Sequence, residues 1–98
     1  KATVYGGTTA WAGGWIWAPG NPAAQRLGIA EPIDAPRQYL KTLLGSAFDA
    51  ERVEAFLTFA PRAIEFLETE AGLSFECGSL IPDTYSEVEG AGQGGGAR

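Results

Sequence analysis

The fold depends most on residues 50–68, which read AERVEAFLTFAPRAIEFLE. Apolar side chains recur in this stretch three and four residues apart, which is the spacing of one face of an α-helix. They are Val53, Phe56, Leu57, Ala60, Ile64 and Leu67. Asp49 can cap the first turn, and Gly72 can end the last one. Because Pro61 removes one backbone hydrogen bond, we expect residues 50–71 to form a kinked helix or two helices.

A second helix is predicted upstream, over residues 35–44. Asp34 can accept a hydrogen bond from a free N–H group of its first turn, Pro36 suits that turn, and Gly45 ends the helix. The side chains expected to be buried are Leu40, Leu43 and Leu44.

The N-terminal region is rich in glycine and tryptophan, and residues 6–22 read GGTTAWAGGWIWAPGNP. Before it, residues 2–5 (ATVY) predict the tail of a strand. Thr8 or Thr9 can cap a short helix over residues 8–13. Prolines and glycines then predict an irregular path over residues 15–29.

The C-terminal region begins with LSFEC at residues 73–77, where apolar and polar side chains alternate as in a short strand. Residues 90–98 carry no large apolar side chain, so we expect them to be mobile unless a larger body holds them. The elements together predict a mainly α chain with a short β element, an α+β fold class.

The composition excludes several kinds of site. The chain has no His, a single Cys (Cys77) and a net charge of −5, so a zinc site, a Ser-His-Asp triad and a basic nucleic-acid surface are not expected, and no metal site is predicted. No apolar run is long enough to span a bilayer. We expect a reducing compartment, the cytoplasm.

Three features admit two readings each. Glycine pairs with two Thr between them suit a phosphate or pyrophosphate, and they equally suit a plain turn before a capped helix. Indoles in a Gly-rich loop can wall a flat ligand, or they can anchor the loop to a core, which is the better reading for Trp17. Tyr85 is the residue of the C-terminal half that can move a proton, although an ordinary surface tyrosine is the alternative.

The order of motifs resembles a known family. Three motifs carry the resemblance, in this order: GGTTA-x-[SA]-GG, W-x-PGN, and PD-x-Y within IPDTYSE. Nearly the whole chain is similar to the early part of the FAD-binding domain in the fumarate reductase/succinate dehydrogenase flavoprotein superfamily. Within it, the chain is most similar to the 3-ketosteroid Δ1-dehydrogenase-like branch. The resemblance implies an internal piece, residues 1–98, of an α/β Rossmann-like FAD-binding domain that lacks the GxGxxG turn. Its parts are a flavin-contact segment (1–22), a helical segment (34–71) and a strand with a Gly-rich tail (73–98).

The resemblance also assigns site residues. The positions that match the FAD-contact segment are Gly6, Gly7, Thr8, Thr9, Ala12, Gly13 and Gly14. Gly7 stands where some members carry the histidine that bonds to FAD, so non-covalent FAD is implied. Trp15, Ile81 and Thr84 match positions that line the substrate cavity. Thr84 replaces a tyrosine of the family's PDYY segment and Tyr85 keeps the second one, which argues against true ketosteroid dehydrogenation.

The resemblance implies an FAD-dependent dehydrogenase or reductase of bacterial origin. It moves a hydride between flavin and a carbon next to an activated carbonyl, and a steroid-like ketone is one substrate class. We expect these 98 residues to be inactive alone, with the rest of the flavoenzyme as partner, and to self-associate. Two alternatives stay open: a small helical interaction module with exposed tryptophans, and one chain of a nicked or split flavoenzyme.

Overall fold

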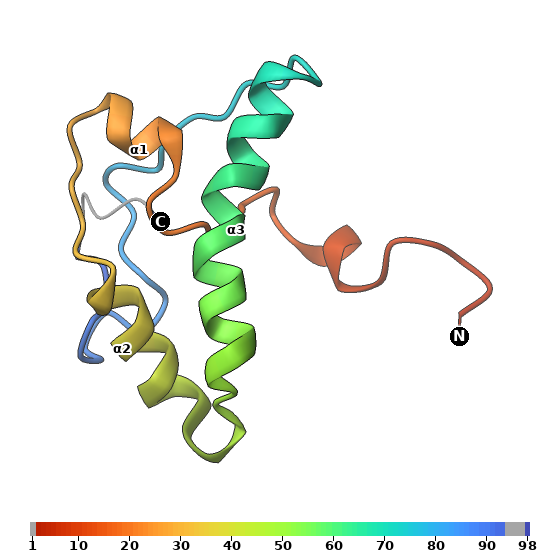
Figure 1. The fold of residues 1–98 in the computed structure, drawn as a ribbon. Helices are drawn as coiled ribbons and strands as arrows, with labels where there is room; N and C mark the ends of the chain where they lie inside the picture. The colour runs from red at the N-terminus through yellow and green to blue at the C-terminus, as the bar shows by residue number, and fades with distance from the viewer. Residues whose placement is uncertain (1, 94–97) are drawn as a thin grey trace.

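One long helix organises the molecule, and shorter helices and loops pack along it (Figure 1). The computed structural model describes residues 2–93 and 98. In chain order the helices are η1 (Gly7–Trp11), α1 (Pro22–Arg26), α2 (Asp34–Leu44), η2 (Gly45–Ala47) and α3 (Ala50–Thr69), where η denotes a 3-10 helix. Both α1 and α2 contact α3. None of the helices in this described part combines the length and the hydropathy that a bilayer-crossing segment needs.

Helix α3 forms as its spacing predicts. The Asp49 side chain accepts a hydrogen bond from the backbone N–H of Arg52 at 3.1 Å, which confirms the predicted N-cap. Val53, Leu57 and Ile64 are buried on the face toward the rest of the chain. The helix continues through Pro61 as one element, so of the two predicted alternatives, a kinked helix or two helices, the second is not found. A proline removes a single hydrogen bond, and packing on both sides of it holds the remaining turns.

Helix α2 has the predicted extent but a different buried face. Its N-cap is Ile33, and no side chain caps it, so the predicted Asp34 cap is wrong. Tyr39 is buried, whereas Leu43 and Leu44 are 38% and 40% exposed, contrary to the predicted stripe. The reason is the C-terminal segment: Gly90 lies so close to the helix that a Cβ there would meet the Ala35 carbonyl oxygen at 2.2 Å. That approach covers the face that carries Tyr39.

Helix α1 lies inside the stretch predicted to be irregular. The Asn21 side chain accepts from the Ala24 N–H at 2.9 Å, and Pro22 occupies the first turn. Ala23 and Ala24 are buried against α3. Sequence reasoning counted the prolines here as breakers, although a proline after an Asn cap starts a helix.

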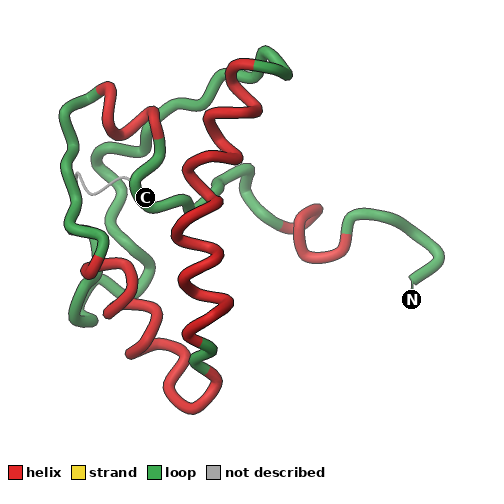
Figure 2. The backbone as a smooth tube through the Cα atoms, viewed as in Figure 1, coloured by secondary structure: helices red, strands yellow, loops and turns green. Residues whose placement is uncertain are grey.

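The predicted fold class is wrong, because residues 2–93 and 98 contain no strand (Figure 2). The LSFEC stretch pairs with no strand among the described residues and bonds locally instead: Leu73 N–H donates to Leu67 O at 3.1 Å, Ser79 N–H donates to Cys77 O at 2.9 Å, and the Phe75 backbone bonds to the Glu68 carboxylate. Residues 3–5 form bends rather than the predicted end of a strand. A five-residue stretch with no neighbouring strand has no ladder to join. Neither the α+β class nor a Rossmann-like α/β fold is therefore found in this part of the chain.

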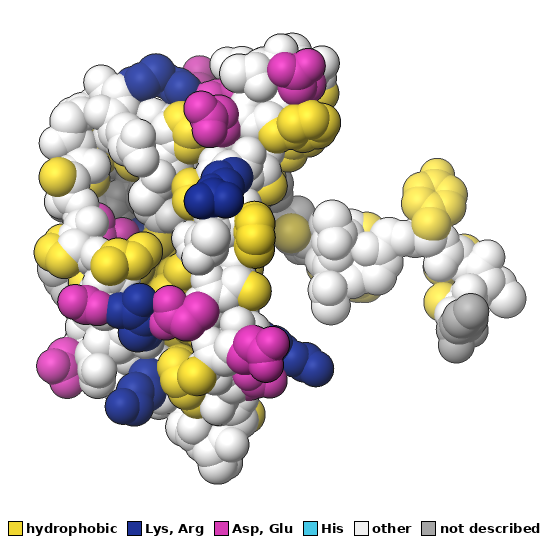
Figure 3. All heavy atoms as spheres, in the orientation of Figure 1, with side chains coloured by type: hydrophobic (Ala, Val, Ile, Leu, Met, Phe, Trp, Pro, Cys, Tyr) yellow, Lys and Arg dark blue, Asp and Glu magenta, His cyan; other side chains and the backbone are white. Residues whose placement is uncertain are grey.

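The N-terminal segment stands clear of the body and carries apolar side chains (Figures 1 and 3). All residues from 2 to 16 are exposed. Helix η1 begins after Gly6, whose φ is 114°, and no side chain caps it, so the predicted caps at Thr8 and Thr9 are wrong. We call residues 2–12 the N-terminal arm.

Candidate functional site

A groove of about 740 Å³ lies where the N-terminal arm joins the body. One side comes from residues 13–18 and the other from residues 74–84, two stretches that are far apart in the sequence. Five of the predicted site residues line it: Gly13, Gly14, Trp15, Ile81 and Thr84. The structure thus brings the end of the Gly-rich segment together with the predicted substrate-lining residues.

The remaining predicted contact residues lie apart from the groove. Gly6, Gly7, Thr8, Thr9 and Ala12 belong to the exposed arm and do not line it. Gly6 and Gly7 have φ values of 114° and 54°, which side-chain-bearing residues rarely adopt. Because no side chain caps η1, the first N–H groups of its turn remain open to an anionic ligand or to water.

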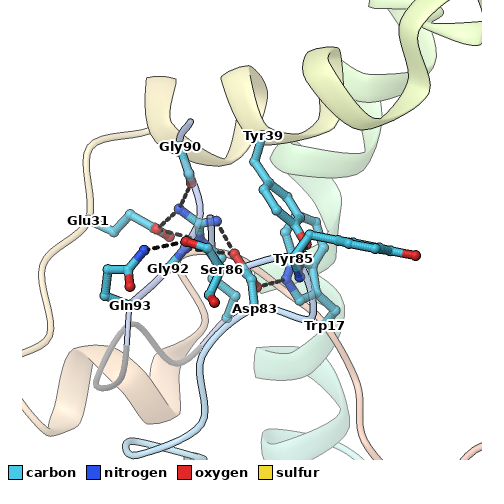
Figure 4. A network of polar contacts seen from close by, with 10 residues as sticks. Trp17, Glu31, Tyr39, Asp83, Tyr85, Ser86, Gly90, Gly92 and Gln93 are labelled. Carbon is cyan, nitrogen blue, oxygen red and sulfur yellow. Dashed lines mark hydrogen bonds and ion pairs between the residues drawn. The ribbon is translucent and has the colours of Figure 1, made fainter. Parts of the chain in front are cut away.

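Tyr85 also lies outside the groove lining. Its side chain is 52% exposed and extends away from the neighbouring polar network (Figure 4). Its backbone N–H donates to the Tyr39 hydroxyl at 3.3 Å. The backbone of Tyr85 is therefore tied to Tyr39, and its phenol extends into solvent.

Asp83 anchors the back of the groove, and sequence reasoning missed it. Its Oδ1 accepts from Trp17 Nε1–H at 2.7 Å, and its Oδ2 accepts from Gly92 N–H at 2.7 Å (Figure 4). Asp83 is 7% exposed. The Trp17 ring also stacks on Phe56 of α3, with centroids 5.9 Å apart. One carboxylate thus ties the N-terminal stretch, the PDTY turn and the tail to one another.

Arg98 completes this network. Its guanidinium pairs with Asp83 and Glu31, donates to Gly90 O, and lies over the Tyr39 ring at 5.7 Å from the centroid. Its side chain is 2% exposed. A buried aspartate requires partners, and the Arg98 guanidinium is one of them, a pairing that the sequence analysis did not predict.

Two ion pairs outside the groove hold the helices together. Arg26 of α1 makes a two-bond pair with Glu68 of α3, both at 2.8 Å, and the hydrogen bonds lower the pKa of Glu68 below its ordinary value. Arg37 of α2 pairs with Glu54 of α3 in the same way and lowers the pKa of Glu54. These pairs fix the shorter helices against the helix that supports the groove.

The groove can hold a flat, mainly apolar ring. Trp15, Ile16 and Ile81 supply apolar surface, and the Thr84 hydroxyl supplies a hydrogen-bonding group. The open N–H groups of the arm offer the chemistry of a phosphate site on the same segment.

Comparison with known proteins identifies the family to which the chain belongs. Residues 1–96 match the family described as FAD binding domain. No solved structure matches the chain.

Three relatives illustrate the similarity. The 3-oxosteroid 1-dehydrogenase of Rhodococcus opacus is 36% identical over 85 residues, covering 87% of this chain and 16% of the relative. The enzyme of the same name from Mycobacterium tuberculosis H37Rv is 34% identical over 95 residues, covering 97% of this chain and 17% of the relative. The 4-oxocyclohex-2-ene-1-carboxylate 5-dehydrogenase of Sinomonas cyclohexanicum is 35% identical over 97 residues, covering 99% and 16%.

The chain spans about a sixth of the length of these relatives. The resemblance inferred from GGTTA-x-[SA]-GG, W-x-PGN and PD-x-Y is confirmed at the level of the family. The chain therefore belongs to the FAD binding domain family, with FAD as its cofactor, and 3-oxosteroid 1-dehydrogenases are among its relatives.

Proposed function

We propose that the chain forms part of an FAD-dependent dehydrogenase or reductase that moves a hydride between flavin and a carbon next to the carbonyl of a cyclic ketone. The observation that carries this proposal is the groove in which Gly13 and Gly14 meet Trp15, Ile81 and Thr84. The printed names of the relatives support it, since they denote dehydrogenases of 3-oxosteroids and of oxocyclohexene carboxylates.

The residues of the arm fit FAD. Gly6 and Gly7 have the positive φ values that let a backbone turn its N–H groups toward one ligand, and the uncapped start of η1 leaves those groups open. The Thr8 and Thr9 hydroxyls can add hydrogen bonds, and Ala12, Gly13 and Gly14 leave room for a bulky ring. Because the chain has no His, we propose that FAD is held without a covalent bond to it.

The opposite side of the groove would receive the substrate. Trp15 and Ile81 would pack on the faces of the ketone ring, and the Thr84 hydroxyl would donate to the ketone oxygen and polarise it. FAD, when bound, supplies the two-electron chemistry. Tyr85 stays a candidate for proton transfer. It is a weak one, because its phenol is exposed and does not line the groove.

We further propose that the chain works as a partial FAD-binding domain. Residues 1–22 would form its flavin-contact segment, residues 34–71 its helical segment and residues 73–98 its Gly-rich tail. The partner would be the remainder of a flavoenzyme, since the relatives are about six times as long, and the 98 residues would be inactive alone. A bacterial cytoplasmic location is the expectation, given bacterial relatives.

Flavin binding tests the proposal. The complete natural polypeptide should purify with a flavin absorbance band, and acid precipitation should release the flavin into the supernatant. Thr9→Ala should weaken FAD about tenfold, because one hydrogen bond to a charged group contributes about 1.5 kcal/mol. Thr42→Ala is the matched control, since the Thr42 hydroxyl bonds to Gln38 O within α2.

A polypeptide that takes up no FAD at any concentration would overturn the proposal. Flavin that stays with the acid-precipitated protein would contradict non-covalent binding. Equal losses in Thr9→Ala and Thr42→Ala would show that the arm makes no specific contact.

A further inference from the structure

Three charged residues line the groove: Glu76, Asp83 and Arg98. The Arg98 guanidinium is the one cation among them, and it is already engaged. It pairs with Asp83 and Glu31 and donates to the Gly90 carbonyl oxygen, and its side chain is 2% exposed. A ligand that carries a carboxylate therefore finds no accessible cation on the part of the groove that the described residues form.

Glu76 is placed differently from the other two. It is exposed, and its carboxylate forms no ion pair or hydrogen bond with any residue of the described chain. By contrast, Asp83 is 7% exposed, and its two oxygens are taken up by Trp17, Gly92 and Arg98. Glu76 thus contributes the uncompensated charge of this groove lining, and that charge is negative.

The backbone next to Glu76 is held against two neighbours. On one side, the Phe75 backbone bonds to the Glu68 carboxylate of α3. On the other side, Gly78 lies close to the Trp15 indole, since a Cβ built on Gly78 would come within 2.8 Å of Trp15 Cζ3. These contacts keep residue 76 at the groove, so its charge stays there although the side chain itself can turn.

A negative charge at the groove treats two kinds of ketone differently. An uncharged ketone neither gains nor loses binding energy from it. A ketone that bears a carboxylate is repelled, because like charges a few ångströms apart repel even in water, and no accessible cation of the described lining offsets the repulsion. Specificity arises from such a difference between two ligands rather than from the tightness of either one.

We propose that Glu76 is a specificity-determining residue of the groove, which favours ring ketones without a carboxylate over oxo acids of the same ring. This inference rests on the proposed function, because it names the substrate class of the same groove. The proposed function leaves both kinds of ketone open. The charge of Glu76 separates them whatever their size.

The experiment uses the complete natural polypeptide and isothermal titration calorimetry. The two probes are phenol and 4-hydroxybenzoate, which share a flat ring with one oxygen and differ by a carboxylate. Neither ring can be dehydrogenated further, so the dissociation constants describe binding alone. Wild type is compared with Glu76→Gln, which removes the charge and keeps the size of the side chain. Glu87→Gln is the matched control, since Glu87 is also exposed and does not line the groove.

We expect wild type to bind phenol more tightly than 4-hydroxybenzoate. Glu76→Gln should leave the constant for phenol unchanged and tighten 4-hydroxybenzoate about fivefold at low salt, the size of a repulsion between two charges about 4 Å apart in water. In about 0.5 M salt that gain should fall below about twofold, because salt screens exposed charges. Glu87→Gln should behave as wild type.

A Glu76→Gln variant that changes both constants equally, or changes neither, would overturn the proposal. So would tighter binding of 4-hydroxybenzoate than of phenol by wild type, no binding of either probe, a gain that persists at high salt, or an equal gain in Glu87→Gln. The flavin absorbance of the same samples reports separately on the proposed function: a polypeptide without flavin that still shows the salt-dependent gain would refute flavin binding and leave the role of Glu76 standing.

Discussion

A single carboxylate, that of Asp83, satisfies three donors at once. Trp17 Nε1–H, Gly92 N–H and the Arg98 guanidinium all converge on it, and it is 7% exposed. The side-chain amide of an asparagine at this position cannot accept all three hydrogen bonds. It also leaves the buried Arg98 guanidinium with one carboxylate partner fewer.

Asp83→Asn should therefore lower the free energy of unfolding by about 3 kcal/mol, the usual cost of breaking a buried ion pair on one side. The measurement is the urea midpoint with an unchanged m-value. The control is Asp34→Asn, which removes an aspartate whose side chain is 84% exposed and paired on the surface with Arg37. Its effect should stay within about 0.5 kcal/mol. Similar losses in both variants would contradict a special role for Asp83.

At the scale of residues, motifs grouped three side chains that line one groove, but they did not indicate what holds the groove in place. Trp15, Ile81 and Thr84 were assigned through motifs, and they do meet in one groove. Asp83 and Arg98 were missed because their pairing joins positions that are 15 residues apart in the sequence. No periodic pattern reports such a contact.

At the scale of elements, the aspartates at the N-terminal ends of α2 and α3 differ in a testable way. Asp49 accepts a bond from the first turn of α3, whereas Asp34 is the first residue of α2 and caps nothing. Asp49→Ala should cost about 1 kcal/mol of unfolding free energy, as typical N-caps do. Asp34→Ala should cost about 0.5 kcal/mol or less, since only a surface ion pair is lost. Urea denaturation of both variants gives the comparison, and a larger loss in Asp34→Ala would refute the assignment.

The ion pairs that join the helices predict a pH dependence. Arg37 lowers the pKa of Glu54, and Arg26 lowers the pKa of Glu68. A carboxyl whose pKa is lower in the folded chain stabilises the fold above its unfolded pKa, about 4.3. That contribution is lost as the pH falls through the lower, folded value.

Carboxyl NMR titration measures these values directly. Arg26→Gln should raise the pKa of Glu68 toward its ordinary value and leave that of Glu54 in place, and Arg37→Gln should do the reverse. Each variant is thus the control for the other. If either substitution moved both pKa values together, the two pairs would not be independent links between helices.

Whether an element depends on local spacing or on a distant segment explains which elements the sequence predicted correctly. The i, i+3, i+4 spacing over residues 50–68 identified α3, because local spacing alone determines a helical face. The buried side of α2 was misjudged because the C-terminal segment, which approaches at Gly90, decides it. The strand at residues 73–77 failed for the same reason, since a strand exists only with a neighbour.

At the scale of the whole molecule, the N-terminal arm leaves large apolar side chains in water. Tyr5, Trp11 and Val4 are 101%, 91% and 76% exposed. We expect the isolated 98-residue chain to self-associate, because apolar surface of this kind favours contact with another surface. Light scattering over a concentration series measures this. Trp11→Ser should reduce the association, whereas Leu80→Ser, which changes an exposed residue off the arm, should reduce it less. A monomer at every concentration would contradict the expectation.

The bond between Trp17 and Asp83 also sets an order for folding. It joins residues 66 positions apart, so closing that loop costs more chain entropy than forming α2 and α3, whose contacts are local. The helices should therefore associate first, and the carboxylate should be captured after the rate-limiting barrier. Asp83→Asn would then speed unfolding and leave the refolding rate nearly unchanged, as stopped-flow kinetics can establish. The contact that holds the groove in its final shape would thus act as a latch, setting how long the native state lasts rather than how quickly it is reached.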